Sequence, residues 1–182
     1  MTNSKLLYFI LVLCLNLQLI FAQKITPEIE LKIKEKVNLE LGKFLKRTTI
    51  NKYQDKDLIE FILDTMKIEK TVEYSINYDF TTTGMNSIVF KAGQEYDALM
   101  NKYYKKLLAI LQKDDKQVLI DAQRAWLTSR DLEMKLIQTV SKPQYSGGGS
   151  IQSNLNVSDE QEMIKERVVS LFNYFTRAKG EF

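Results

Sequence analysis

The sequence has no histidine, one cysteine, two prolines and seven glycines among its 182 residues. The absence of histidine removes the commonest general base and zinc ligand, and Cys14 is the single thiol. We therefore expect no metal, no cofactor and no enzyme activity, since only carboxylates, lysine or serine could carry a reaction. Because few residues interrupt helices, the chain is predicted to be mainly α-helical.

The N-terminal segment has one lysine, then the apolar run Leu6–Leu15, and it closes on Ala22. This pattern predicts a signal peptide that is cleaved after Ala22, so that the protein is secreted or periplasmic and keeps no stable membrane span. An uncleaved membrane anchor is an alternative, because the run could nearly span a bilayer. A lipoprotein is another, although Leu13 stands where a small residue should precede Cys14. Cleavage would leave no cysteine and hence no disulfide.

Lysine and arginine number 26 against 23 acidic residues, a net charge of +3. Removal of residues 1–22 takes one lysine and leaves 25 basic side chains. So balanced a charge predicts no nucleic-acid partner. We divide the chain into the signal peptide at 1–22, an N-terminal helical extension at 23–80 and a helical domain at 81–182.

Two helices are predicted in the extension. The first has Thr26 as its N-cap and Pro27 at its first position, which proline favours. Its apolar side comprises Ile29, Ile33, Val37, Leu41 and Phe44 or Leu45. The second begins at Asp55 or Asp57 and ends near residues 66–70. Partial alternation over 71–80 is compatible with a short strand or an ordered loop, and we favour the loop because no partner strand is evident.

The domain at 81–182 is predicted to contain three further helices. The first runs from Met85 or Ser87 to Leu111, and a turn at 112–115 returns the next, Asp115–Val140, antiparallel to it. The buried stripe of the first comprises Tyr96, Met100, Tyr103, Leu107 and Ile110 or Leu111.

A glycine-rich connection precedes the last helix. Pro143 and Gly147–Gly149 predict a flexible, exposed segment without a helix. Ser158 and Gln161 form a capping box that predicts the start of the last helix, which ends by Gly180. Its buried face comprises Ile164, Val168, Leu171, Phe172 and Phe175. The predicted fold is an all-α bundle of about four to five helices, with a Gly-rich loop before the last one and room for one short extended segment.

Two phrases carry a resemblance to a known family. The segment Tyr96–Leu108 ends in Tyr-Lys-Lys-Leu-Leu, and Gln123–Asp131 reads Gln-Arg-Ala-Trp-Leu-Thr-Ser-Arg-Asp. With the glycines at Gly147–Ser150 and the later Arg167, this resembles the N-terminal domain of the lysozyme-inhibitor LprI type, over roughly residues 84–178. The domain at 81–182 is accordingly LprI-like.

The sequence departs from the family pattern at its two cysteines. Family members place one shortly after a Met-Asn pair, but here Met85-Asn86 is followed by Ser87 and Ile88. The other position holds Met134. Losing both members of a pair leaves no stray thiol, and apolar replacements can keep the contact by packing. What the resemblance implies is an envelope or secreted binding protein, with lysozyme as the partner after which the family is named.

The family phrase and the glycine-rich segment supply the candidate site residues. In one interpretation Trp126 is a core anchor covered by an arginine stem, and Asp131 pairs with a basic residue on a neighbouring helix such as Arg167. In the other, Arg130 and Asp131 face a groove and recognise a ligand. The candidate residues are Arg124, Trp126, Arg130, Asp131, Gly147, Gly148, Gly149 and Arg167.

Three functions follow from these observations. A lysozyme inhibitor must offer a protruding loop to a cleft that holds two carboxylates, and Lys142–Ser153 has that character; the alternative is an ordinary connector. A structural or interaction protein of the envelope, binding a protein or a glycan, is the second function. A carboxylate-only hydrolase is the third, but no spacing selects a pair among its candidate acids, Glu95, Asp97, Asp131 and Glu133.

Overall fold

The computed structural model describes residues 24–48 and 56–180. The predicted signal peptide and its cleavage after Ala22 lie outside the described residues, as does Asp55. Within the described ranges the chain forms six helices and no strand, which confirms the all-α prediction. The helices are α2 (Pro27–Arg47), α3 (Lys56–Ile76), α4 (Thr82–Ile110), α5 (Lys116–Val140), α6 (Pro143–Ser146) and α7 (Ile151–Lys179).

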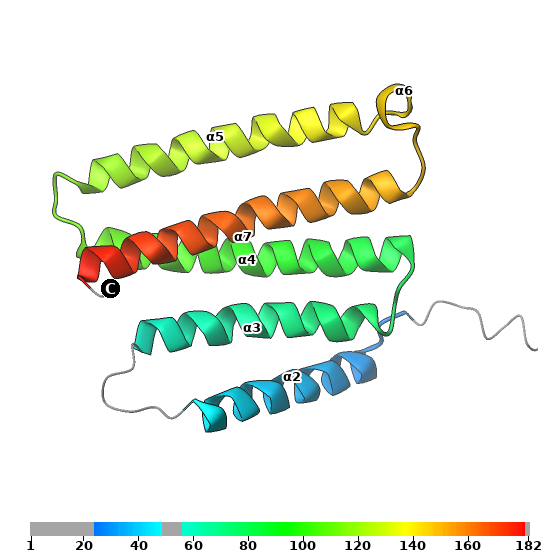
Figure 1. Ribbon diagram of the computed structural model, residues 1–182, viewed down its shortest axis with the longest axis horizontal. Helices are drawn as coiled ribbons and strands as arrows, with labels where there is room; N and C mark the ends of the chain where they lie inside the picture. Colours follow the sequence, from blue (N-terminus) through cyan, green and yellow to red (C-terminus); the bar gives the residue numbers. More distant parts are fainter. Residues whose placement is uncertain (1–23, 49–55, 181–182) are drawn as a thin grey trace, which may run out of the picture.

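The five long helices lie roughly in a row, with α2 at one edge and α5 at the other (Figure 1). The most extensive packing is between α4 and α7, which run in the same direction. Helix α5 runs antiparallel to α4, as predicted, and therefore also to α7. On the other side α3 packs on α4, and α2 packs on α3. An edge helix with a single neighbour buries less of its surface than a central one.

Helix α2 begins and packs as its sequence predicts. Thr26 is the N-cap, and its hydroxyl oxygen accepts a hydrogen bond of 3.3 Å from the Ile29 backbone N–H. Pro27 occupies the first position, where its missing N–H costs nothing. Ile33 and Val37 are buried.

The strand or loop predicted over 71–80 is wrong for residues 71–76, because α3 continues to Ile76, whereas residues 77–80 form a turn and loop. The buried side chains of this segment recur with the spacing of a helix. Ile68 and Ser75 are buried, and Val72 between them packs on the core. Asp57 lies inside the helix rather than capping it. The alternation of apolar side chains between residues 72 and 78 is therefore incidental.

A turn that contains the buried carboxylate of Asp79 joins α3 to α4. The Asp79 carboxylate accepts a hydrogen bond of 2.6 Å from the Thr81 hydroxyl, whose oxygen accepts one of 3.0 Å from the Gly84 backbone N–H. Thr81 is thus the N-cap, and α4 begins at Thr82, a few residues before the predicted start. A Cβ atom on Gly84 would lie 2.1 Å from the Asp79 carboxylate, so this position needs glycine.

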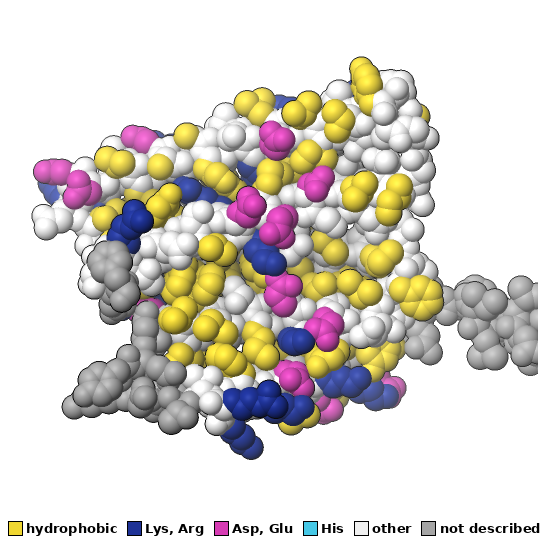
Figure 2. Space-filling view, viewed as in Figure 1, with side chains coloured by type: hydrophobic (Ala, Val, Ile, Leu, Met, Phe, Trp, Pro, Cys, Tyr) yellow, Lys and Arg dark blue, Asp and Glu magenta, His cyan; other side chains and the backbone are white. Residues whose placement is uncertain are grey.

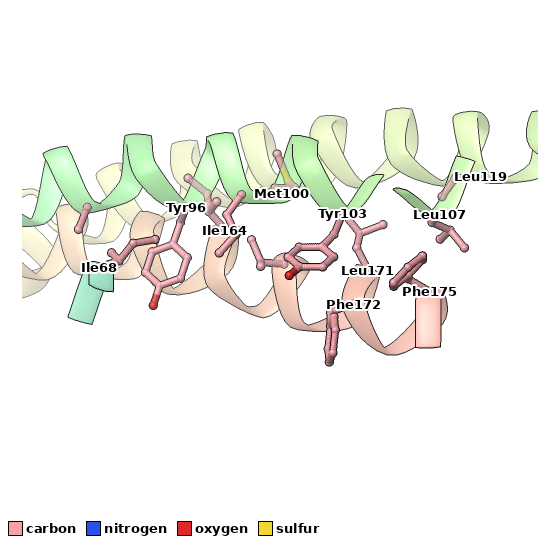
Figure 3. Packing of buried hydrophobic residues seen from close by; sticks show 13 residues of the cluster. Ile68, Tyr96, Met100, Tyr103, Leu107, Leu119, Ile164, Leu171, Phe172 and Phe175 are labelled. Carbon is pink, nitrogen blue, oxygen red and sulfur yellow. The ribbon is translucent and has the colours of Figure 1, made fainter. Parts of the chain in front are cut away.

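The core lies between α4 and α7. The predicted stripe on α4 is confirmed through Leu107, and of its two alternative last members Leu111 packs against the core whereas Ile110 is exposed. The predicted face of α7 is buried from Ile164 to Phe175, and Figure 3 shows both sets of side chains meeting between the two helices. Helix α3 joins this core through Phe61, whose ring stacks on Phe172 with centroids 4.1 Å apart. The proposed division of the chain at residue 80 stays a prediction.

Lysines of α4 connect it to carboxylates on α3. The Lys106 amino group lies 2.7 Å from Asp57 and 2.5 Å from Glu60, and Lys102 lies 2.7 Å from Glu60 and also pairs with Asp64. Hydrogen bonds from Lys102 and Lys106 hold the pKa of Glu60 below its ordinary value. These pairs flank the apolar contact and fix the relative position of the two helices.

The predicted start of the last helix at Ser158 is wrong. Helix α7 begins at Ile151, so Ser158 and Gln161 lie inside it. Residues 151–157 include neither proline nor glycine, so nothing in the backbone opposes a helix there. A hydrogen bond of 2.9 Å from the Asn86 side chain to the Ser153 hydroxyl ties this first turn to α4. The end at Gly180, in the left-handed conformation with φ 76°, is as predicted.

Candidate functional site

Trp126 is the centre of a cluster that attaches α5 to the bundle. Its ring is partly buried against the core. The guanidinium carbons of Arg130 and Arg167 each lie 5.6 Å from the ring centroid. Arg130 comes from the next turn of α5 and Arg167 from α7, so two cations from different helices contact one indole. Arginines do lie over the Trp126 ring, but the contact is made by their guanidinium groups, whereas the prediction was of an arginine stem.

Gln123 completes the cluster by bonding in two directions. Its side-chain oxygen accepts a hydrogen bond of 2.9 Å from Arg167 Nε, and its amide nitrogen lies 3.5 Å from Met100 Sδ on α4. Burial lowers the pKa of the Arg167 guanidinium. Gln123, Trp126 and Arg130 stand three and four residues apart on one side of α5, so this part of the family phrase joins three helices.

The predicted pair between Asp131 and Arg167 is wrong. Asp131 instead accepts hydrogen bonds of 3.1 and 2.8 Å from Nε and Nη2 of the adjacent Arg130, and its side chain is 61% exposed. A residue one position after Arg130 is rotated by about 100° around the helix, which turns Asp131 away from α7. Arg167 meets the neutral Gln123 amide instead.

The family phrase therefore has an inner and an outer side. Arg124 is the second outer residue: its side chain is 73% exposed, and its closest carboxylate is Asp121 at 3.5 Å. Trp126 and Arg130 pack within the bundle, whereas Arg124 and Asp131 contact only neighbouring residues of α5 through exposed ion pairs. These two residues are the exposed part of the phrase.

A groove of about 240 Å³ lies beside the cluster. Arg130 lines it, in agreement with the second interpretation of that residue, whereas Asp131 does not. Gly93 contributes no side chain to the groove wall, and the space beside it is empty, because a Cβ atom built there would have no other atom within 4 Å. Its other lining residues are Val89, Phe90, Gln94 and Asp97 of α4, and Val157, Glu160, Gln161 and Ile164 of α7.

Sequence reasoning missed most of the groove. Most of its residues come from the exposed and half-buried flanks of α4 and α7, where periodicity gives no signal for function. The one available signal was Gly93, an isolated glycine inside a helix, which commonly has a packing or functional reason. Of the four acids considered for a hydrolase, Asp97 lines the groove, whereas Glu95, Asp131 and Glu133 are exposed and do not.

The segment predicted as a flexible connection is exposed but built in a defined way. Pro143 starts the one-turn helix α6, contrary to the prediction that no helix forms there, because proline is acceptable in a first turn. The Ser146 hydroxyl donates a hydrogen bond of 2.8 Å to the Ser141 carbonyl and accepts one of 3.1 Å from the Gly148 N–H. Gly147, Gly148 and Gly149 have φ of 77°, 79° and 94°, which other residues rarely adopt.

The charged and apolar surfaces of the bundle are distributed differently. Figure 2 shows a band of acidic and basic side chains crossing the row of helices, with apolar side chains on both sides of it.

None of the helices in the described part of the chain has the length and hydropathy of a membrane span. Over the same residues no group of three or more metal-binding side chains comes together.

Fold and site together define an all-α bundle that offers a groove and an ordered exposed loop. Residues 77–171 match the family model described as Lysozyme inhibitor LprI. That match covers more than half of the chain, and the chain belongs to this family. It spans α4, α5, α6 and most of α7, in agreement with the resemblance seen in the sequence. Comparison with curated proteins and with solved structures gives no match.

Proposed function

We propose that this chain is an exported binding protein that inhibits lysozyme, and that it is not an enzyme. The family match over residues 77–171 carries this proposal, because the family is described by that activity. Export is part of the proposal, since an inhibitor must reach the cell envelope or its surroundings to meet a wall-degrading enzyme. The apolar N-terminal segment is the feature that would direct it there.

The loop Lys142–Ser153 is the surface we propose to enter the enzyme's cleft. Tyr145 is 68% exposed at its tip and offers a large, rigid side chain, and Lys142 supplies a cation for a cleft with two catalytic carboxylates. The hydrogen bonds of Ser146 order the loop before binding. A pre-ordered loop loses less conformational entropy on binding than a flexible one, which favours affinity.

The loop assignment is tested by titrating lysozyme activity on a cell-wall substrate with the intact protein and with two loop variants, Tyr145→Ala and a deletion of Gly147–Gly149. The matched control is Phe80→Ala, which removes an aromatic ring that is 74% exposed on the turn between α3 and α4. We expect at least a tenfold loss of inhibition for both loop variants and none for the control. Equal inhibition by all four proteins would place the contact elsewhere.

The groove favours a second candidate function, binding of an envelope glycan. Phe90 is 55% exposed and provides an apolar face for a sugar ring, while Gln94, Asp97 and Arg130 provide hydrogen-bond partners. Because Arg130 touches both the groove and Trp126, a bound sugar should change the fluorescence of Trp126. Titration with soluble peptidoglycan fragments tests this, with Phe90→Ala as the variant that should abolish the change. A flat titration of the intact protein would exclude glycan binding in the groove.

A further inference from the structure

Helix α5 has a second apolar side that faces away from the rest of the bundle. Its inner side carries Leu119, Trp126 and the rest of the cluster. All members of the second set are exposed, with the large ones between 50% and 69%, and apolar side chains are visible along this edge in Figure 2. The outer stripe comprises Val118, Ala122, Ala125, Ser129, Leu132, Leu136 and Val140.

The outer stripe is narrow and continuous. At about 100° per residue its seven positions fall within an arc of about 80°, and from Val118 to Val140 it is about 33 Å long. Helix α5 packs on α7 through its inner side, so within the described residues no other helix covers this stripe extensively. A long apolar stripe of this kind is unusual on a solvated face and marks an interaction surface.

We propose that the outer stripe binds the same stripe of a second copy of this chain, with the two α5 helices antiparallel about a two-fold axis near Ser129. A two-fold interface must be self-complementary. Reversing the stripe about Ser129 sets Ala122 opposite Leu136 and Ala125 opposite Leu132, so that small side chains face large ones. A parallel pair would instead set alanines against alanines and leucines against leucines, and would leave gaps.

Charge complementarity supports the same register. Asp121, Thr128 and Lys135 are exposed along one edge of the stripe at intervals of seven residues. In an antiparallel helix pair, this edge of one copy faces the same edge of the other. Asp121 of each copy then lies opposite Lys135 of the other, which gives two symmetric ion pairs, and the two Thr128 side chains meet near the axis.

The expected affinity of the dimer follows from the small size of a contact between one pair of helices. A single pair of helices is expected to bury less than the roughly 800 Å² per partner of a standard interface, and we expect dissociation constants in the micromolar range. The dimer does not depend on the proposed function.

Cysteine cross-linking tests the register. All proteins carry Cys14→Ser, so that an introduced cysteine is the only thiol. Ser129→Cys should form a disulfide-linked dimer under mild oxidation, because the two residues meet at the axis. The control is Val118→Cys, at a position that is also exposed but should lie about 33 Å from its counterpart. Cross-linking of both to the same extent, or of neither, would overturn the antiparallel arrangement.

Sedimentation over a range of concentrations tests the surface itself. Leu132→Glu with Leu136→Glu should raise the dissociation constant at least tenfold. Leu31→Glu with Leu39→Glu, on leucines that are 57% and 60% exposed on α2, should not. Asp121→Lys alone should weaken the dimer, and adding Lys135→Asp should restore it. A monomer at every concentration, or equal effects of the two leucine pairs, would refute the proposal.

Discussion

Replacing Arg167 by alanine tests whether the Trp126 cluster is what attaches α5 to the bundle. The change removes the bond of 2.9 Å to Gln123 and the cation 5.6 Å from the Trp126 ring. A hydrogen bond to a charged group contributes about 1.5–3 kcal/mol, and a cation over an indole about 0.5–1 kcal/mol. Burial of the guanidinium offsets about 1–2 kcal/mol of this. The two contributions together are about 2–4 kcal/mol, so the expected net loss of stability is about 1–2 kcal/mol.

The assay uses the single tryptophan of the chain, Trp126. Its fluorescence reports the attachment of α5, whereas far-ultraviolet circular dichroism reports helix content as a whole. In urea, Arg167→Ala should shift the fluorescence midpoint further than the dichroism midpoint, because α5 leaves the bundle first. Such a divergence would show that the variant no longer unfolds in one step.

Arg124→Ala is the matched control. Arg124 belongs to the same family phrase and carries the same charge, but its side chain is 73% exposed. Substitution at such a site should change the free energy of unfolding by less than about 0.5 kcal/mol. The reasoning fails if Arg124→Ala destabilises the chain as much as Arg167→Ala, or if Arg167→Ala leaves the fluorescence midpoint unchanged.

Three further predictions concern the rest of the fold. Gly84→Ala should lower the free energy of unfolding in urea by about 1–3 kcal/mol, because its Cβ would lie 2.1 Å from the Asp79 carboxylate. Gly42→Ala is the control: a Cβ there has nothing within 4 Å, and the change should stabilise α2 by about 0.5–1 kcal/mol. Phe172→Ala should cost about 3–5 kcal/mol in the same assay through loss of core packing. Because the pKa of Glu60 is lowered in the fold, its contribution is complete above the unfolded pKa and is lost as pH falls through the folded value; Glu60→Gln should flatten the fall of the melting temperature below pH 5.

The helices that sequence predicted well are those whose apolar period agrees with their burial. On α4 the spacing of Tyr96, Met100, Tyr103 and Leu107 leaves one possible inner face, and the core confirms it. The end of α3 was missed because apolar and aromatic side chains at alternate positions imitate a strand, namely those of Val72, Tyr74, Ile76 and Tyr78. Its helical period runs through Ser75, a buried polar residue that a search for apolar side chains passes over.

Predictions of helix ends and of pairs across helices were weaker for a different reason. A capping box at Ser158 is a local signal for a helix start. The seven residues before it are helical as well, so α7 begins at Ile151 and the box lies inside the helix. Likewise, no local pattern shows that Arg167 meets Gln123 rather than Asp131, since that choice depends on how α5 is rotated against α7. The groove was missed for the same reason, because its two walls are far apart in sequence and come together only when the helices pack.

The activity of lysozyme on a cell-wall substrate, measured with rising amounts of the intact protein, tests the central claim most directly. Stoichiometric loss of activity, relieved by Tyr145→Ala but not by Phe80→Ala, is the result expected of an inhibitor that acts through its ordered loop. Full lysozyme activity at a large excess of the protein, across several lysozyme types, would contradict the assignment and leave glycan binding in the groove as the function to pursue.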